Sequence, residues 1–169
     1  MSPLDEFHLL LGRLTHAAAQ LDFNVGLSIR WLVEHNGEPS SDLLSGTKPF
    51  KLRLDELNRL IGKTFDLTNP EVATAFDAWF QGAHEARALR NDYVHARWGV
   101  RGDFDDREPF AEYVQLNWNM SPETAQPSNR VTFADFDKQI EEVRRLNQDL
   151  GDLQRRYAHL AAPATGRGT

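Results

Sequence analysis

The 169-residue sequence contains no cysteine. This absence excludes a disulfide framework and any metal site built from thiolates. The sequence also lacks an apolar run near the roughly 18 residues that a membrane helix needs. Its first residues, Met-Ser-Pro-Leu-Asp-Glu, are acidic where a secretory signal is basic. We therefore expect a soluble, cytoplasmic protein that does not contact a membrane.

Basic residues are in the minority. The chain has 19 lysines and arginines against 25 aspartates and glutamates, and its net charge is −6. That balance argues against a passive nucleic-acid coat held mainly by counterion release. Positive charge is nevertheless concentrated in one stretch, which contains Arg87, Arg90, Arg97 and Arg101. A local basic cleft on an acidic body remains compatible with the composition.

Helical periodicity dominates the sequence. Apolar residues that return every three or four positions predict four helices, at about 4–36, 50–62, 70–94 and 133–160. Asn36-Gly37 is a typical helix stop. Asn69-Pro70 is a strong helix start, and Thr132 with Asp135 can cap the last helix.

The segment between the last two long helices breaks this pattern. Residues 111–118 have the aromatic and β-branched content of a strand, an earlier short strand is expected before 101–109, and 120–129 is expected to be a polar loop. We predict an all-α, up-and-down four-helix bundle with an irregular or hairpin insertion at this point. Residues 1–162 would form one domain, and 163–169 a disordered tail.

The hairpin region also carries an acidic run, Asp103, Asp105 and Asp106. Clustered carboxylates suit Mg²⁺ or Ca²⁺, but no complete loop signature surrounds them, so an acidic turn is the preferred interpretation. The six histidines have no zinc-site spacing. We expect no metal and no cofactor.

The third predicted helix carries an anomaly. At 100° per residue, its apolar side chains define a buried stripe that extends to Tyr93 and Val94, and Arg90 falls at the centre of that stripe. Asn91, His84 and His95 lie together along one side of this stripe. A buried guanidinium is costly unless it is paired, so Arg90 either serves a site or pairs with a carboxylate such as Glu85 or an acidic residue of the first helix.

The grouping of Arg90, Asn91 and His95 suits a phosphodiester substrate. Asn91 and His95 are spaced i, i+4 and so lie side by side on a helix. An arginine neutralises charge on phosphoryl oxygens, and a histidine moves a proton to or from a ribose oxygen. Further candidates for substrate binding are Arg87, Arg97, Tyr93 and His84.

The run Arg90-Asn91-Asp92-Tyr93-Val94-His95 resembles the R-x(4–6)-H signature of the HEPN superfamily, including the polar residue that commonly follows the arginine. The close match covers about residues 87–98. The resemblance implies a helical bundle that acts as a metal-independent endoribonuclease, a homodimer with a composite active site, and RNA products with 2′,3′-cyclic phosphate ends. It also implies a toxin or phage-defence setting with an antitoxin or inhibitor as partner.

One position departs from part of that family. Members paired with a nucleotidyltransferase-like antitoxin often carry tyrosine two residues after the histidine, where this chain has Arg97, so that antitoxin class is disfavoured. Two alternative functions stay open. One is a non-catalytic HEPN-like module that binds nucleotide, RNA or protein. The other is a helical interaction protein in which the motif is accidental.

Overall fold

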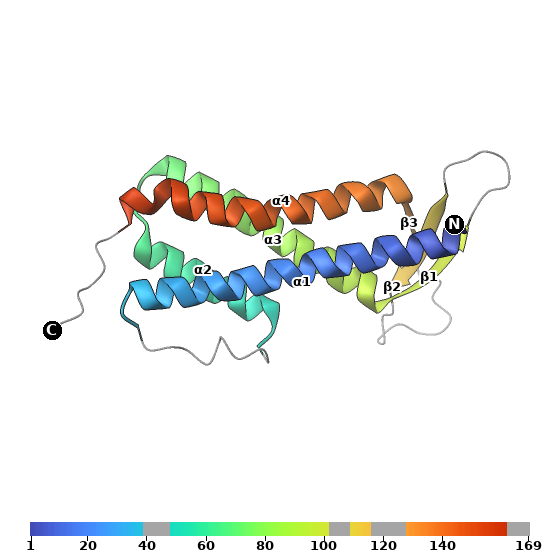
Figure 1. Ribbon diagram of the computed structural model, residues 1–169, viewed down its shortest axis with the longest axis horizontal. Helices are drawn as coiled ribbons and strands as arrows, with labels where there is room; N and C mark the ends of the chain where they lie inside the picture. The colour runs from blue at the N-terminus through green and yellow to red at the C-terminus, as the bar shows by residue number, and fades with distance from the viewer. Residues whose placement is uncertain (39–47, 102–108, 116–127, 162–169) are drawn as a thin grey trace.

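Four helices and a small sheet make up the computed structural model (Figure 1), which describes residues 1–38, 48–101, 109–115 and 128–161. The elements are α1 (Pro3–His35), α2 (Phe50–Thr64), α3 (Pro70–His95), β1 (Ala96–Arg101), β2 (Phe110–Gln115), β3 (Asn129–Thr132), α4 (Phe133–Tyr157) and the 3-10 turn η2 (Ala158–Leu160). The four predicted helices are confirmed. The predicted tail and the acidic run at 103–106 fall outside the described residues.

The predicted all-α class is wrong, because the chain between α3 and α4 forms a three-stranded antiparallel sheet in the order β1-β2-β3. The expected hairpin corresponds to β1 and β2, in which Trp98 lies opposite Tyr113. The third strand, β3, was not predicted. It has four residues, of which only Val131 is buried. Such a short, polar edge strand carries almost no period-2 hydrophobic signal.

The predicted up-and-down order of helices is also wrong. Asp22 and Asn36 on α1 bind Arg53 and Thr64 on α2, in the same order along both helices, so α1 and α2 are parallel. The α1 residues Arg13 and Asn24 bind Asp137 and Asn147 on α4, again in the same order. Only α3 runs the other way (Figure 1). A heptad seam has no direction, so periodicity alone could not reveal this arrangement.

Antiparallel packing of α3 on α4 follows from two contacts. The indole Nε1 of Trp79 donates to the carbonyl oxygen of Leu146 at 2.9 Å, and the hydroxyl of Tyr93 donates to Gln139 at 3.1 Å. The sheet between the two helices turns the chain back at one end of the bundle (Figure 1). The last residues of α3 are therefore held against the sheet.

Aromatic side chains join this sheet to the helices. Trp98 on β1 contacts the rings of Phe7, Tyr93, Tyr113 and Phe136, with centroid distances of 4.7 to 5.8 Å. Its indole Nε1 also donates to the carbonyl oxygen of Tyr93 at 2.8 Å. Such offset and edge contacts stabilise beyond the area that they bury. These aromatic contacts fix where α3 ends.

None of the helices in the described part of the chain is long and apolar enough to cross a membrane.

The end of α1 is a Schellman motif, as the Asn36-Gly37 pair predicts. Gly37 has φ of 64°, its N–H donates to Glu34, and the N–H of Glu38 donates to Val33. A side chain is strained in this left-handed conformation. Gly12 offers the opposite case, because it lies inside α1 and a Cβ there would meet nothing within 4 Å.

We expect Gly37→Ala to lower the free energy of unfolding by about 1 kcal/mol. Gly12→Ala should raise it by roughly 0.5–1 kcal/mol, because alanine loses less backbone entropy in a helix. Urea unfolding followed by circular dichroism measures both. Equal effects of the two substitutions would contradict the assignment of the helix end.

Candidate functional site

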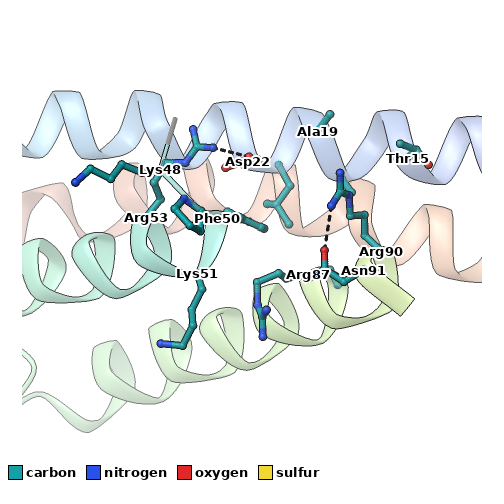
Figure 2. A pocket seen from close by; sticks show the side chains of 14 residues that line it. Thr15, Ala19, Asp22, Lys48, Phe50, Lys51, Arg53, Arg87, Arg90 and Asn91 are labelled. Carbon is teal, nitrogen blue, oxygen red and sulfur yellow. Dashed lines mark hydrogen bonds and ion pairs between the residues drawn. The ribbon is translucent and has the colours of Figure 1, made fainter. Parts of the chain in front are cut away.

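A cavity of about 350 Å³ lies between the middle of α1, the start of α2 and the C-terminal half of α3 (Figure 2). Ala18 and Ala19 on α1 and Ala86 on α3 line it, and these short side chains leave space between the helices. Phe50 lines it from α2. Three segments far apart in the sequence therefore meet here.

Positive charge is concentrated around this cavity. Five cationic side chains and a single carboxylate, that of Asp22, are among its lining residues; the cations are Lys48, Lys51, Arg53, Arg87 and Arg90. The whole chain has a net charge of −6. A concave site with this excess of cations attracts anions and focuses their approach. Phosphate groups fit it, since arginine binds phosphate oxygens with two parallel hydrogen bonds.

Some of these charges are already paired. The Nη2 of Arg53 lies 2.7 Å from Asp22 Oδ2, and Lys51 Nζ lies 2.7 Å from Asp55 Oδ2. Arg90 Nη1 donates to Asn91 Oδ1 at 3.0 Å. Figure 2 shows Arg53 and Arg90 both reaching from their own helices toward α1. The amide of Asn91 thus holds one edge of the Arg90 guanidinium.

Three buried polar atoms of the lining side chains have no hydrogen-bond partner within the protein: Asp22 Oδ1, Arg53 Nε and Arg87 Nε. Buried polar groups in native proteins are almost always satisfied, so each such atom calls for an explanation. Burial raises the pKa of the Asp22 carboxyl above its ordinary value, and the positive charges of Arg53 and Arg90 oppose that rise. The side chains that line the cavity therefore include two buried donors and one buried acceptor without a partner.

The structure brings together three of the candidates, Arg87, Arg90 and Asn91. His95 is absent from the lining. It is the last residue of α3, exposed, and one turn beyond Asn91 on the same side of the helix. Within this chain the predicted arginine and histidine are five residues apart, about 140° from each other around α3, and only the arginine lines the cavity.

The other three candidates lie elsewhere. Tyr93 is 3% exposed and its hydroxyl binds Gln139 on α4; burial raises its pKa to about 12. His84 is half-buried on α3 and does not line the cavity. Arg97 is exposed on β1, where half-buried and exposed residues alternate and Trp98 takes the helix side. Tyr93 thus belongs to the aromatic core, on the α4 side of α3.

The prediction that Arg90 and Val94 continue the buried stripe of α3 is wrong. Both are exposed, whereas Ala86 and Tyr93 are buried. The stripe changes partner along the helix, because α3 turns its buried side toward α4 and the sheet near its end. Glu85, the suggested partner of Arg90, instead accepts a hydrogen bond from Gln81. The α1 carboxylate Asp22 pairs with Arg53.

Sequence reasoning missed the contribution of α2. Lys48, Lys51 and Arg53 supply three of the five cations, and Asp22 supplies the free acceptor. The signal was present, since Lys-Pro-Phe-Lys-Leu-Arg at 48–53 is as densely basic as the stretch that contains Arg90. Its relation to α3 depends on the parallel packing of α1 and α2, which the sequence did not predict.

Metal binding has no support in the described residues, among which no three histidine or acidic side chains are grouped as ligands. The acidic run at Asp103, Asp105 and Asp106 lies outside the described residues.

Comparison of the chain with protein-family models, with curated proteins and with solved structures gives no match. The assignment of function therefore depends on the residues of the site.

If the cavity binds anions, inorganic phosphate should stabilise the protein against heat more than chloride does at equal ionic strength. At about ten times the dissociation constant, linkage gives about 1.4 kcal/mol, or a rise in Tm of about 3 to 5 °C for a chain of this size. Arg53→Gln and Arg87→Gln should each lose most of that rise.

The matched control is Arg144→Gln. Arg144 lies on α4 in an ion pair with Glu141, away from the cavity. It changes the net charge by the same amount as the other two substitutions. Phosphate should still stabilise it as it does the unmodified protein. The same loss in all three variants would mean that phosphate acts through net charge and not through this cavity.

Proposed function

We propose that the protein is a metal-independent endoribonuclease of HEPN type. The observation that carries the proposal is the placement of Arg90, held by Asn91, at a cationic cavity, with His95 exposed one helical turn beyond. Arg90 and Asn91 suit the binding of a phosphodiester. Histidine, the residue type at position 95, is the side chain best suited to proton transfer near neutral pH.

In this proposal a ribose 2′-hydroxyl attacks the adjacent phosphorus and the bond from phosphorus to the 5′ oxygen breaks. The products are a 2′,3′-cyclic phosphate and a free 5′-hydroxyl. His95 removes the proton from the 2′-hydroxyl or donates one to the departing oxygen. Arg90 stabilises the negative charge that builds on the phosphoryl oxygens, and Asn91 orients its guanidinium. The chemistry requires no metal ion.

A homodimer would complete the site. The imidazole of His95 does not line the cavity that contains Arg90 of the same chain, and it is exposed, so a second copy can bring its His95 to that cavity. RNA is the substrate in this proposal, and an antitoxin or inhibitor protein that covers the cavity is the expected regulator. We place the protein in the cytoplasm, in a toxin or phage-defence role.

The second candidate is a non-catalytic module that binds RNA or nucleotides. The position of His95 outside the cavity favours it, since five cations are sufficient to bind a phosphate without cleaving it. Both candidates require anion binding. Only the first candidate predicts that the protein cleaves RNA, so a cleavage assay distinguishes the two.

Purified protein should cleave single-stranded RNA in EDTA, leaving 2′,3′-cyclic phosphate ends. Arg90→Ala should reduce the rate by about 10²–10³-fold, and His95→Ala by about 10²–10⁴-fold. His84→Ala is the control and should keep its activity, because His84 does not line the cavity and, unlike the exposed His95, is half-buried. The measurement is the rate of product formation under single-turnover conditions.

An active site shared between two copies of the chain predicts a further result in the same assay. Inactive Arg90→Ala and inactive His95→Ala proteins, when mixed, should regain activity, because a mixed dimer contains one site with both intact residues. Absence of cleavage in the unmodified protein under every condition would eliminate the enzyme and leave the binding module. If the single variants keep the activity of the unmodified protein, Arg90 and His95 are not the catalytic residues.

A further inference from the structure

Arg53, Arg87 and Asp22 are not used by the proposed cleavage. They come from three different helices, and each has a buried polar atom that finds no partner in the protein. All three line the same cavity as Arg90. The free atoms differ in kind, because the two Nε atoms donate hydrogen bonds and the carboxylate Oδ1 accepts one.

This arrangement selects among ligands. Two guanidinium donors require an anion or a strong acceptor, whereas the carboxylate Oδ1 would repel an anion and requires a donor. A ligand that satisfies the adjacent Arg53 and Asp22 atoms must carry an anionic group beside a hydroxyl or N–H. Sulfate fails that test, because it has no proton to donate at neutral pH, whereas hydrogen phosphate keeps an O–H and passes it. A ribonucleotide unit passes it, since its 2′-hydroxyl lies next to the 3′-phosphate.

The pairing of Asp22 with Arg53 supports this assignment. Arg53 Nη2 holds Asp22 Oδ2 at 2.7 Å, which leaves Oδ1 and Arg53 Nε as the unpartnered atoms of one joined pair. The side chains of Arg53 and Asp22 are only 15% and 28% exposed. Little freedom to rotate remains in a pair that is bound and largely buried, so the donor and the acceptor are pre-positioned.

We propose that this part of the cavity is a ribose-recognising subsite for RNA, in which Asp22 Oδ1 accepts a hydrogen bond from a 2′-hydroxyl while Arg53 binds the neighbouring phosphate. Arg87, which Figure 2 shows directed away from this pair, then binds a further phosphate of the strand. Asp22 then determines the preference for RNA over DNA, because only RNA offers the donor. The subsite rests on the proposed function for the choice of RNA as ligand. It does not depend on cleavage.

The test measures binding and not catalysis. Dissociation constants of short single-stranded RNA, its 2′-O-methyl analogue and the matching DNA are measured by fluorescence anisotropy in EDTA. All proteins carry His95→Ala, which lies outside the cavity, so that RNA stays intact. The parent should bind RNA about tenfold or more tightly than either analogue, as expected for a hydrogen bond to a charged group.

Asp22→Ala in this background should bring the three affinities close to one another. It should also tighten the binding of DNA, because a negative charge has been removed from the cavity. Asp22→Asn keeps an acceptor oxygen and should retain part of the preference. The control is Glu141→Ala, which removes the same charge from the ion pair with Arg144 on α4, away from the cavity, and should leave the preference unchanged.

Arg87→Gln should weaken RNA and DNA binding alike. It should also lower the slope of log K against log salt concentration by about 0.7, the value for one phosphate contact on a single strand. A parent that binds RNA and its 2′-O-methyl analogue equally would overturn the subsite, even if Asp22→Ala failed to fold. A preference that survives intact in Asp22→Ala would overturn it as well.

The outcomes separate this subsite from the proposed enzyme. RNA preference that depends on Asp22 without any cleavage by the unmodified protein would keep the subsite and remove the ribonuclease. Cleavage that depends on Arg90 and His95, with no effect of Asp22 on the preference for RNA over DNA, would keep the ribonuclease and remove the subsite.

Discussion

Burial of one long helix is the constraint on which the rest of this structure depends. The helix α1 has 33 residues and is therefore about 50 Å long, longer than α2, α3 or α4. No single partner covers it. Four α1 side chains are completely buried in the helical part of the bundle: Leu21, Val25, Ile29 and Leu32. Phe7 is buried against Trp98 of β1 and Phe136 of α4. Each other element is placed by the part of α1 that it covers.

The cavity follows from the same constraint. Where α1 presents Ala18, Ala19 and Asp22, its side chains are too short to fill the space between α2 and α3. The helix α3 meanwhile turns its apolar side toward α4 and the sheet, which leaves Arg87 and Arg90 beside the gap. Cations from α2 complete the lining. The gap left between the helices is thereby also strongly basic.

Asp22 has two roles in this picture. Its bond to Arg53 ties α1 to α2 near the start of α2, and so helps to set their parallel direction. Its second oxygen stays buried without a partner, at a cost that its raised pKa reflects. Hydrophobic burial elsewhere in the bundle offsets such a cost. Ligand binding is one physical explanation for a polar atom that stays buried and unsatisfied.

Several features could be predicted from the sequence because they are local. The four helices, the caps at Asn69 and Thr132, and the stop at Gly37 depend on residues a few positions apart. The grouping of Arg90 with Asn91 is also local. The strand β3 escaped prediction because an edge strand of four mostly polar residues has no pattern of its own and forms only by pairing with β2.

The amino-acid sequence by itself determined which segments are helical and placed an arginine, an amide and a histidine on one helix. Tertiary structure decided the rest. It set α1, α2 and α4 parallel, brought Lys48, Lys51 and Arg53 to the arginines of α3, buried Tyr93 on the α4 side, and left His95 outside the cavity. The physical reason is that periodicity specifies which face of a helix is buried but not which neighbour covers it or in which direction that neighbour runs.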